Sequence, residues 1–230
     1  MGSRLQELLG LSESAVAVAF VDEVPDGVEC VEESALSGCS YWQQAAGGQV
    51  VATVPEDHFS CPIGAFTHGV ELPEAEAEGQ QQMIGMMVEL EYLRMEDVPE
   101  IPHRTESFGA VVYSPLELAP CGVDAVIVQG TPRQMMVLAE AATSAGVPGG
   151  PTMGRPTCAA IPEVMQRSQF VTNLGCVGNR VYTGIDDNEL YVVLPGDQVE
   201  AVQEKLEAIV SANHALETFH GGRVPEEQAG

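Results

Sequence analysis

The stretch "DAVIVQGTPRQMMVLAEAATSAG", residues 124–146, sets a short apolar run directly beside a helical pattern. The run "AVIV" has the continuous apolar character of a strand that is buried on both faces. Pro132 stands where a helix would begin, a position that needs no N–H donor, and Gly146 stands where that helix would end. A buried strand that leads into a helix is typical of an α/β sheet covered by helices, so we predict this fold class.

The same alternation continues on both sides of this unit. Further strands are predicted from apolar runs at residues 14–21, 49–54, 109–114, 169–174 and 189–195. Further helices are predicted at residues 4–10, 41–46, 61–69, 74–95, 161–168 and 196–220. Because the strands at 109–114 and 123–129 are joined too briefly for a parallel crossover, we expect a mixed β-sheet.

The charge of the chain limits its partners. Its 230 residues include 34 acidic and nine basic side chains, which gives a formal net charge of −25 at pH 7. A nucleic acid or an anionic membrane surface would repel such a protein, so we expect neither as a partner. The scarcity of lysine and the excess of acid are typical of a halophilic organism, whose molar internal salt screens surface repulsion. An acidic surface that keeps an ordinary protein soluble explains the same counts.

The sequence also favours a reducing compartment. It begins with no basic segment followed by an apolar core, and it has no run of about 18 apolar residues, so we expect a soluble, cytoplasmic protein. Thiols stay reduced in the cytoplasm. The six cysteines therefore need an explanation other than disulfides.

Two cysteines stand in stretches of similar outline. In "SCPIGAFTHG", residues 60–69, and in "GCVGNRVYTG", residues 175–184, a cysteine is followed by glycine, by an aromatic residue near threonine, and by glycine again. Each stretch also follows another cysteine at a similar interval, since Cys39 lies 22 residues before Cys61 and Cys158 lies 18 residues before Cys176. The order of strands and cysteines around them is alike as well.

This likeness suggests an internal repeat. We predict a single α/β domain over residues 1–222, built from two intertwined half-repeats at about 10–95 and 108–195 and followed by a flexible tail at 223–230. Half-repeats that face each other across a pseudo-twofold axis would bring the four cysteines to one place. A chance likeness between two short stretches is the alternative.

Four converging thiolates would bind a soft metal. Sulfur donors select tetrahedral zinc or an iron–sulfur cluster over Mg²⁺ or Ca²⁺. Structural zinc sites commonly take cysteines in pairs about two to four residues apart, and this chain has no C-x-x-C pair. Isolated ligands beside glycine or proline, where main-chain N–H groups can reach a sulfide, favour a cluster. We predict a [4Fe–4S] cluster, with a zinc-stabilised binding module as one alternative.

A metal-free enzyme is the second alternative. A thiolate of Cys61 at a helix N-terminus would be stabilised by the helix dipole, and His58 or His68 could act as its base in a transferase or hydrolase. The sequence identifies no third residue to orient that base. Scattered buried cysteines without a shared site are a further interpretation, and it describes Cys30 and Cys121 best.

Four other side chains near the cysteines could bind a substrate. They are His68, Arg155, Arg180 and Tyr182. Arg155 lies three residues before Cys158 and could balance the charge of a cluster. Each of the four also has an ordinary structural interpretation, because arginine pairs with surface carboxylates and tyrosine covers a core.

Several of these stretches, taken in order, resemble one family. The segments "CSYWQQAAGGQVVATVPEDHFSCPIGAFTHG", "VIVQGTPRQMMVLAEAA", "GRPTCAAIP" and "NLGCVGNRVYTGIDDNELYVVLPG" are similar to domain of unknown function 169, over about residues 3–220. The resemblance implies an archaeal or bacterial cytoplasmic protein. It also implies cysteines at the places of Cys39, Cys61, Cys158 and Cys176, and it assigns no reaction.

The sequence thus predicts an iron–sulfur protein that holds a [4Fe–4S] cluster through these four cysteines. Electron transfer, redox sensing and cluster-assisted catalysis all fit such a site, so whether the protein is an enzyme stays open. Its expected partner is a redox protein or a small-molecule substrate. The apolar stripe of the last helix, at 196–220, allows a homodimer.

Overall fold

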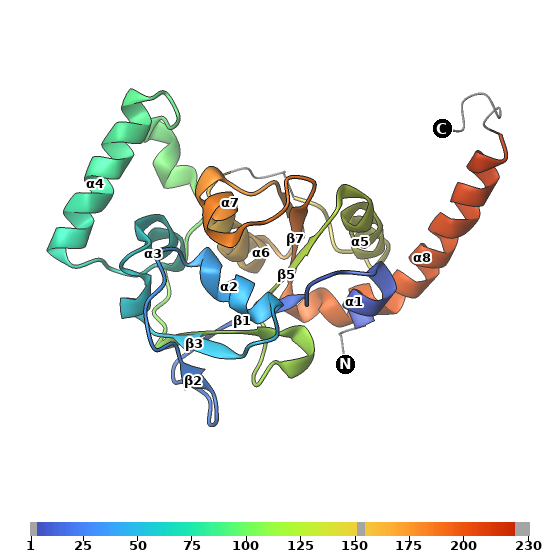
Figure 1. Cartoon of the computed structure of the whole chain (residues 1–230), viewed down its shortest axis with the longest axis horizontal. Helices are drawn as coiled ribbons and strands as arrows, with labels where there is room; N and C mark the ends of the chain where they lie inside the picture. Colours follow the sequence, from blue (N-terminus) through green and yellow to red (C-terminus); the bar gives the residue numbers. More distant parts are fainter. Residues whose placement is uncertain (1–3, 151–154, 224–230) are drawn as a thin grey trace.

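A mixed sheet of seven strands forms the centre of the molecule (Figure 1). The computed structural model describes residues 4–150 and 155–223. The strands lie in the order β2-β3-β4-β1-β5-β7-β6. Their bounds are Val16–Val21 (β1), Glu29–Cys30 (β2), Val51–Thr53 (β3), Ala110–Pro115 (β4), Ala125–Gly130 (β5), Val171–Asn173 (β6) and Leu190–Pro195 (β7).

Helices cover both faces of this sheet, which confirms the α/β class (Figure 1). Their bounds are Arg4–Leu9 (α1), Cys39–Ala46 (α2), Pro62–His68 (α3), Glu74–Glu89 (α4), Pro132–Ser144 (α5), Ala160–Arg167 (α6), Val177–Thr183 (α7) and Val199–Gly221 (α8). None of the helices in the described part of the chain is both long enough and apolar enough to cross a membrane.

The sheet is mixed as predicted, but the argument that led to this prediction was wrong. The parallel pair is β2 with β3, whereas β4 and β5 are not neighbours. Strand β1 lies between them and pairs antiparallel with both. A short segment is enough to connect β4 to β5, which lie on either side of β1. Strand β4 ends opposite Val16 and β5 begins opposite Val18, so the connection has to pass only the end of β1.

Alternation along the strands gives each face of the sheet its own core. In β5, Ala125 and Ile127 pack in the cluster formed with α2 and α6. Val126 and Val128 pack instead in the cluster formed with α1, α5 and α8. Cys39 and Cys158 both belong to the first cluster, so the candidate ligands from the two halves of the chain lie on the same face.

Two helices extend away from the sheet at opposite ends of the molecule, α4 and the distal part of α8 (Figure 1). Helix α4 ends at Glu89, earlier than the predicted 95, because Glu91 adopts a left-handed φ of 54°. Its N–H and that of Tyr92 then donate back to the carbonyls of Val88 and Met87. No glycine marks this end in the sequence. The predicted tail, apart from Arg223, lies outside the described residues.

Candidate metal centre

Each of the four predicted ligands lies at the start of a helix or turn. Cys39 is the first residue of α2, while Cys61 and Cys176 are the N-cap residues of α3 and α7. Cys158 lies in a short 3-10 turn, η4 (Thr157–Ala159), directly before α6. The first N–H groups of a helix have no partner within the helix, and at α7 one of them, the N–H of Asn179, lies 3.5 Å from the Cys176 sulfur.

Packing places the elements that carry the cysteines next to one another. Helix α2 contacts α7, and α3 contacts η4, so each cysteine-bearing element of one half of the chain contacts one of the other half. The main-chain N–H of Cys176 donates to the Thr157 hydroxyl at 2.6 Å, beside Cys158. The Cys61 thiol lies 4.0 Å from the Ser37 hydroxyl, two residues before Cys39.

The thiols are also close enough to affect each other's ionisation. Burial, together with negative charge on Cys61 and Cys176, raises the pKa of Cys39 to about 12, against the lowering effect of a hydrogen-bonding contact from Asn179. Burial likewise raises the pKa of Cys158 well above its usual value, with added effects from charge on Cys39, Cys61 and Cys176. Both thiols are therefore neutral at pH 7, and a metal that binds them must displace protons.

The other two cysteines lie apart from this group. Cys30 is exposed on the edge strand β2. Cys121 is partly buried beside the small cluster of Ala19, Ala52 and Val112. Within residues 4–150 and 155–223, no three His, Cys, Asp or Glu side chains lie close enough together to hold one metal ion.

Two buried histidines lie beside the cysteines and stack on each other. The rings of His58 and His68 are 5.1 Å apart between centroids. Nε2 of His58 hydrogen-bonds the Thr53 hydroxyl at 2.9 Å, while Nδ1 of His68 lies 2.8 Å from the carbonyl of Gly64 and therefore donates to it. Burial lowers the pKa of His58 to about 4 and that of His68 to about 3.

These hydrogen bonds engage one nitrogen of each imidazole. The other nitrogen of His68, Nε2, lies 3.4 Å from the Tyr113 hydroxyl, and that of His58, Nδ1, is buried without a hydrogen-bond partner. The Cys61 thiol lies near the Ser37 hydroxyl. A histidine base for Cys61 therefore stays a prediction.

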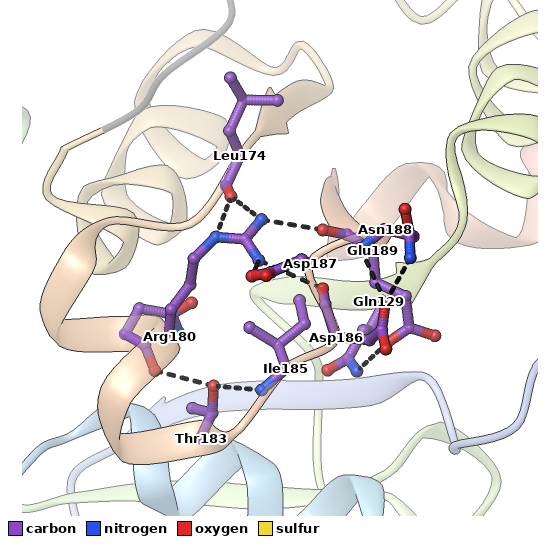
Figure 2. A network of polar contacts seen from close by, with 10 residues as sticks. Gln129, Leu174, Arg180, Thr183, Ile185, Asp186, Asp187, Asn188 and Glu189 are labelled. Carbon is purple, nitrogen blue, oxygen red and sulfur yellow. Dashed lines mark hydrogen bonds and ion pairs between the residues drawn. The ribbon is translucent and has the colours of Figure 1, made fainter.

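Arg180, a predicted substrate-binding residue, closes the loop that follows α7 (Figure 2). Its guanidinium donates to the carbonyl of Leu174 from Nε at 3.1 Å and from Nη2 at 2.6 Å. It also donates to the carbonyls of Asp186 at 3.1 Å and Glu189 at 3.0 Å. These main-chain bonds give Arg180 a structural role, because they hold the segment before α7 against the loop that follows it.

The other predicted substrate-binding residues lie in different surroundings. His68 is buried in the imidazole pair. The guanidinium of Arg155 lies over the ring of Tyr92, 4.1 Å from its centroid. Tyr182 is half-exposed on α7. A role in substrate binding stays a prediction for all four.

The sequence analysis missed a group of buried polar side chains next to Cys39. Trp42, Asn173, Asn179 and Tyr191 are each at most 3% exposed, and each has a polar atom without a hydrogen-bond partner. One signal was present, because Asn179 is the third residue after Cys176 and so shares its face of a helix. The sequence analysis favoured its charged neighbour Arg180 instead.

Comparison with known proteins gives the family of this chain. The profile of domain of unknown function 169, described as "Uncharacterised ArCR", matches residues 4–205. An uncharacterised protein of Methanocaldococcus jannaschii is 27% identical over 220 residues, which cover 89% of this chain and 91% of that protein. No solved structure matches. The match over most of the chain confirms the resemblance seen in its motifs, and the protein belongs to the family of domain of unknown function 169.

Proposed function

We propose that this protein binds one iron–sulfur cluster, of the [4Fe–4S] type, through Cys39, Cys61, Cys158 and Cys176. The observation that supports the proposal is that these four cysteines, which start separate helices or turns, lie near enough for charge on one thiol to raise the pKa of another. A cluster there would supply one-electron redox chemistry. We assign the protein to electron transfer or redox sensing, with cluster-assisted catalysis as a further use of the same site.

The donor set fits a cluster on three counts. Four thiols provide the soft ligands that iron–sulfur clusters take. The surroundings offer N–H groups to sulfur, as where the main-chain N–H of Asn179 lies 3.5 Å from the Cys176 sulfur. One zinc ion needs its ligand sulfurs about 4 Å apart. In a four-iron cluster each cysteine binds a different iron, so the four sulfurs lie farther apart and no three of them have to surround a single ion.

The four cysteines of such a site would differ in their exposure to solvent. Cys39 and Cys158 are buried at 6% and 7% exposure, so this side would exclude water and small oxidants. Cys61 and Cys176 are partly exposed and form the side nearer to solvent. Electrons would therefore exchange with a partner through the Cys61 and Cys176 side. The neutral imidazoles beneath add no charge to the site.

Metal analysis after anaerobic expression tests the proposal. The purified protein should be brown and contain about four iron and four sulfide per chain. Replacing any of the four cysteines with serine should abolish or sharply reduce both. The matched controls are Cys30→Ser and Cys121→Ser, which make the same change outside the group and should leave the iron content unchanged.

Other outcomes identify the rival functions. Zinc without sulfide, lost in the same four variants, would replace the cluster with a zinc-stabilised binding module. A colourless, metal-free protein whose Cys61 reacts much faster with alkylating agents than its other thiols would indicate a cysteine nucleophile. Iron that is retained when Cys39 or Cys158 is replaced would overturn the ligand assignment.

A further inference from the structure

Four unpartnered polar side chains lie in the core beside Cys39. Their exposed fractions are 3% for Trp42, 0% for Asn173, and 1% for both Asn179 and Tyr191. The Trp42 indole Nε1, the Asn173 amide nitrogen, both amide atoms of Asn179 and the Tyr191 hydroxyl make no hydrogen bond of good geometry. The side chains of Thr183, Asn179 and Trp42 nevertheless lie near enough to the Tyr191 hydroxyl to lower its pKa. An unpaired buried polar group destabilises the folded protein, so a group of four needs a physical explanation.

The four side chains come from four different elements and meet around one tyrosine. The Trp42 ring of α2 lies edge-on to the Tyr191 ring of β7, with centroids 6.1 Å apart. Asn173 of β6 is the direct cross-strand partner of Tyr191, so the two side chains emerge on the same face of the sheet. Asn179 of α7 lies close enough to Tyr191 and to Cys39 to affect the pKa of both.

The missing partner of this group is an acceptor. The indole N–H of Trp42 can only donate, and so can the amide nitrogens of Asn173 and Asn179. The acceptor oxygen of Asn173 is already used, since it receives the N–H of Gly175 at 2.8 Å. The unpaired atoms are three donor nitrogens, the Tyr191 hydroxyl, which can donate or accept, and one acceptor, the Asn179 amide oxygen. Donors predominate, so the group favours electron-rich atoms.

The charge and burial of the group indicate which acceptor it faces. All four side chains are neutral, whereas a site for a carboxylate or phosphate usually includes arginine or lysine. Their near-complete burial favours a group that is installed in the protein over a ligand that diffuses in and out. Sulfur atoms with diffuse negative charge, next to Cys39, meet both conditions.

We propose that Trp42, Asn173, Asn179 and Tyr191 donate hydrogen bonds to the sulfur atoms of the cluster on its Cys39 side and thereby raise its reduction potential. This inference rests on the proposed function and adds to it the residues that tune the site. Hydrogen bonds to sulfur stabilise the more negative, reduced state, so each donor shifts the potential upward.

Two variants test this with little change in shape. Tyr191→Phe removes one hydroxyl, and Asn179→Leu removes an amide of similar volume. The matched control is Tyr92→Phe, which removes the same hydroxyl from a partly buried position after α4. After anaerobic reconstitution with iron and sulfide, the midpoint potential is measured by spectroelectrochemical titration. It should move to more negative values in the first two variants and stay unchanged in the control.

A second measurement uses the metal-free protein. Since the Tyr191 hydroxyl makes no hydrogen bond of good geometry there, Tyr191→Phe should leave the melting temperature unchanged or raise it. In the loaded protein the same change should speed loss of the cluster to a chelator. A hydroxyl with a purely structural role would instead lower the melting temperature in both forms.

The outcomes separate this inference from the proposed function. A protein that binds no iron and sulfide overturns both together. A protein that binds a cluster whose potential is the same in all variants overturns the inference alone, and so does a Tyr191→Phe variant that destabilises the metal-free form. A negative shift confined to Tyr191→Phe and Asn179→Leu supports it.

Discussion

Helices α3 and α7 share one plan but differ in what they carry. Each has seven residues, begins after a cysteine N-cap, and ends at a left-handed glycine, Gly69 with φ 75° and Gly184 with φ 66°. Helix α3 ends in the core with the buried His68. Helix α7 instead exposes apolar side chains at its surface, among them Val177 and Val181.

The third residue after each cysteine makes the main difference. In α3 it is Gly64, where an added Cβ would lie 2.9 Å from the Cys61 sulfur. In α7 it is Asn179, whose main-chain N–H faces the Cys176 sulfur at 3.5 Å and whose amide lies near Cys39. Helix α3 thus leaves room for the sulfur of Cys61, whereas α7 places the Asn179 side chain near Cys39 in the other half of the chain.

The comparison bears on the predicted internal repeat. Apart from the edge strand β2, the strands follow the orders β3-β4-β1 and β6-β7-β5 from each side of the sheet inward, with a cysteine-capped helix in each half. The order of elements alone does not show a duplication, and the repeat stays a prediction. What the two halves demonstrably share is the way a short helix presents a cysteine to one face of the sheet.

The largest difference between the two helices should appear at their terminal glycines. In Gly69→Ala the new Cβ would lie 2.5 Å from the Arg104 carbonyl oxygen, whereas in Gly184→Ala nothing lies within 4 Å. Both changes carry the cost of a left-handed alanine, about 1–2 kcal/mol, and the first adds a clash with the main chain. We expect Gly69→Ala to lower the free energy of unfolding by about 3 kcal/mol or more.

Urea denaturation of both variants measures this. Gly184→Ala serves as the matched control, because it makes the same substitution at the same φ without the steric contact. Equal losses in the two variants would show that the α3 end is not held against Arg104. The C-terminal ends of α3 and α7 would then be alike in their packing as well as in their length and backbone conformation.

The second difference concerns the two arginines near the cysteines of the C-terminal half. Arg180 donates to three main-chain carbonyls, while Arg155 stacks on Tyr92. Hydrogen bonds to charged groups contribute about 1.5–3 kcal/mol, and an exposed cation–π contact about 0.5–1 kcal/mol. Arg180→Ala should therefore destabilise the protein by about 2–3 kcal/mol and Arg155→Ala by less than about 1 kcal/mol.

The variant Arg180→Lys separates the effect of the charge from that of the guanidinium geometry. Arg180→Lys keeps the charge but loses the planar fork that reaches Leu174, Asp186 and Glu189 together, so it should recover less than half of the loss. Denaturation midpoints of the three variants give the comparison. Full recovery by lysine would mean that the charge, and not the geometry of the loop, is what matters.

Much of the fold could be predicted from local patterns. Apolar runs predicted six of the seven strands, since a strand buried on both faces is apolar throughout. The two-residue strand β2 is too short and too exposed to leave such a signal. The position of β1 between β4 and β5 also left no local signal, because strand order depends on contacts between distant residues.

The candidate site was predicted to a similar extent. Matched spacing and the family resemblance pointed to the four cysteines. In the structure they lie near enough to affect one another's pKa, and their role as one ligand set stays a prediction. The donors Trp42, Asn173 and Tyr191 could not be found, because each lies on a different element and resembles an ordinary core or strand residue in the sequence. The halophilic origin concerns habitat, and it stays a prediction.

The smallest effect concerns the imidazole pair that only the α3 half contains. Burial lowers the pKa of His58 to about 4 and of His68 to about 3, from an ordinary 6.5. The charge of Arg104 also lowers the pKa of His68, and the facing Tyr113 hydroxyl is neutral in this range. The unfolded chain binds these protons more readily than the folded one, so the stabilisation is complete above pH 6.5 and is lost as the pH falls toward 4.

Each histidine should cost the metal-free protein about 1 kcal/mol of unfolding free energy between about pH 7 and pH 5.5. This window lies above the range in which most carboxylates titrate, so the imidazoles dominate the slope. Denaturation at fixed ionic strength should show a smaller pH dependence in His68→Gln than in the unaltered protein. His220→Gln, at an exposed position near the end of α8, should leave the dependence unchanged. Equal slopes in all three proteins would mean that the pair is not held neutral by burial, and the α3 half would then resemble the α7 half in its electrostatics.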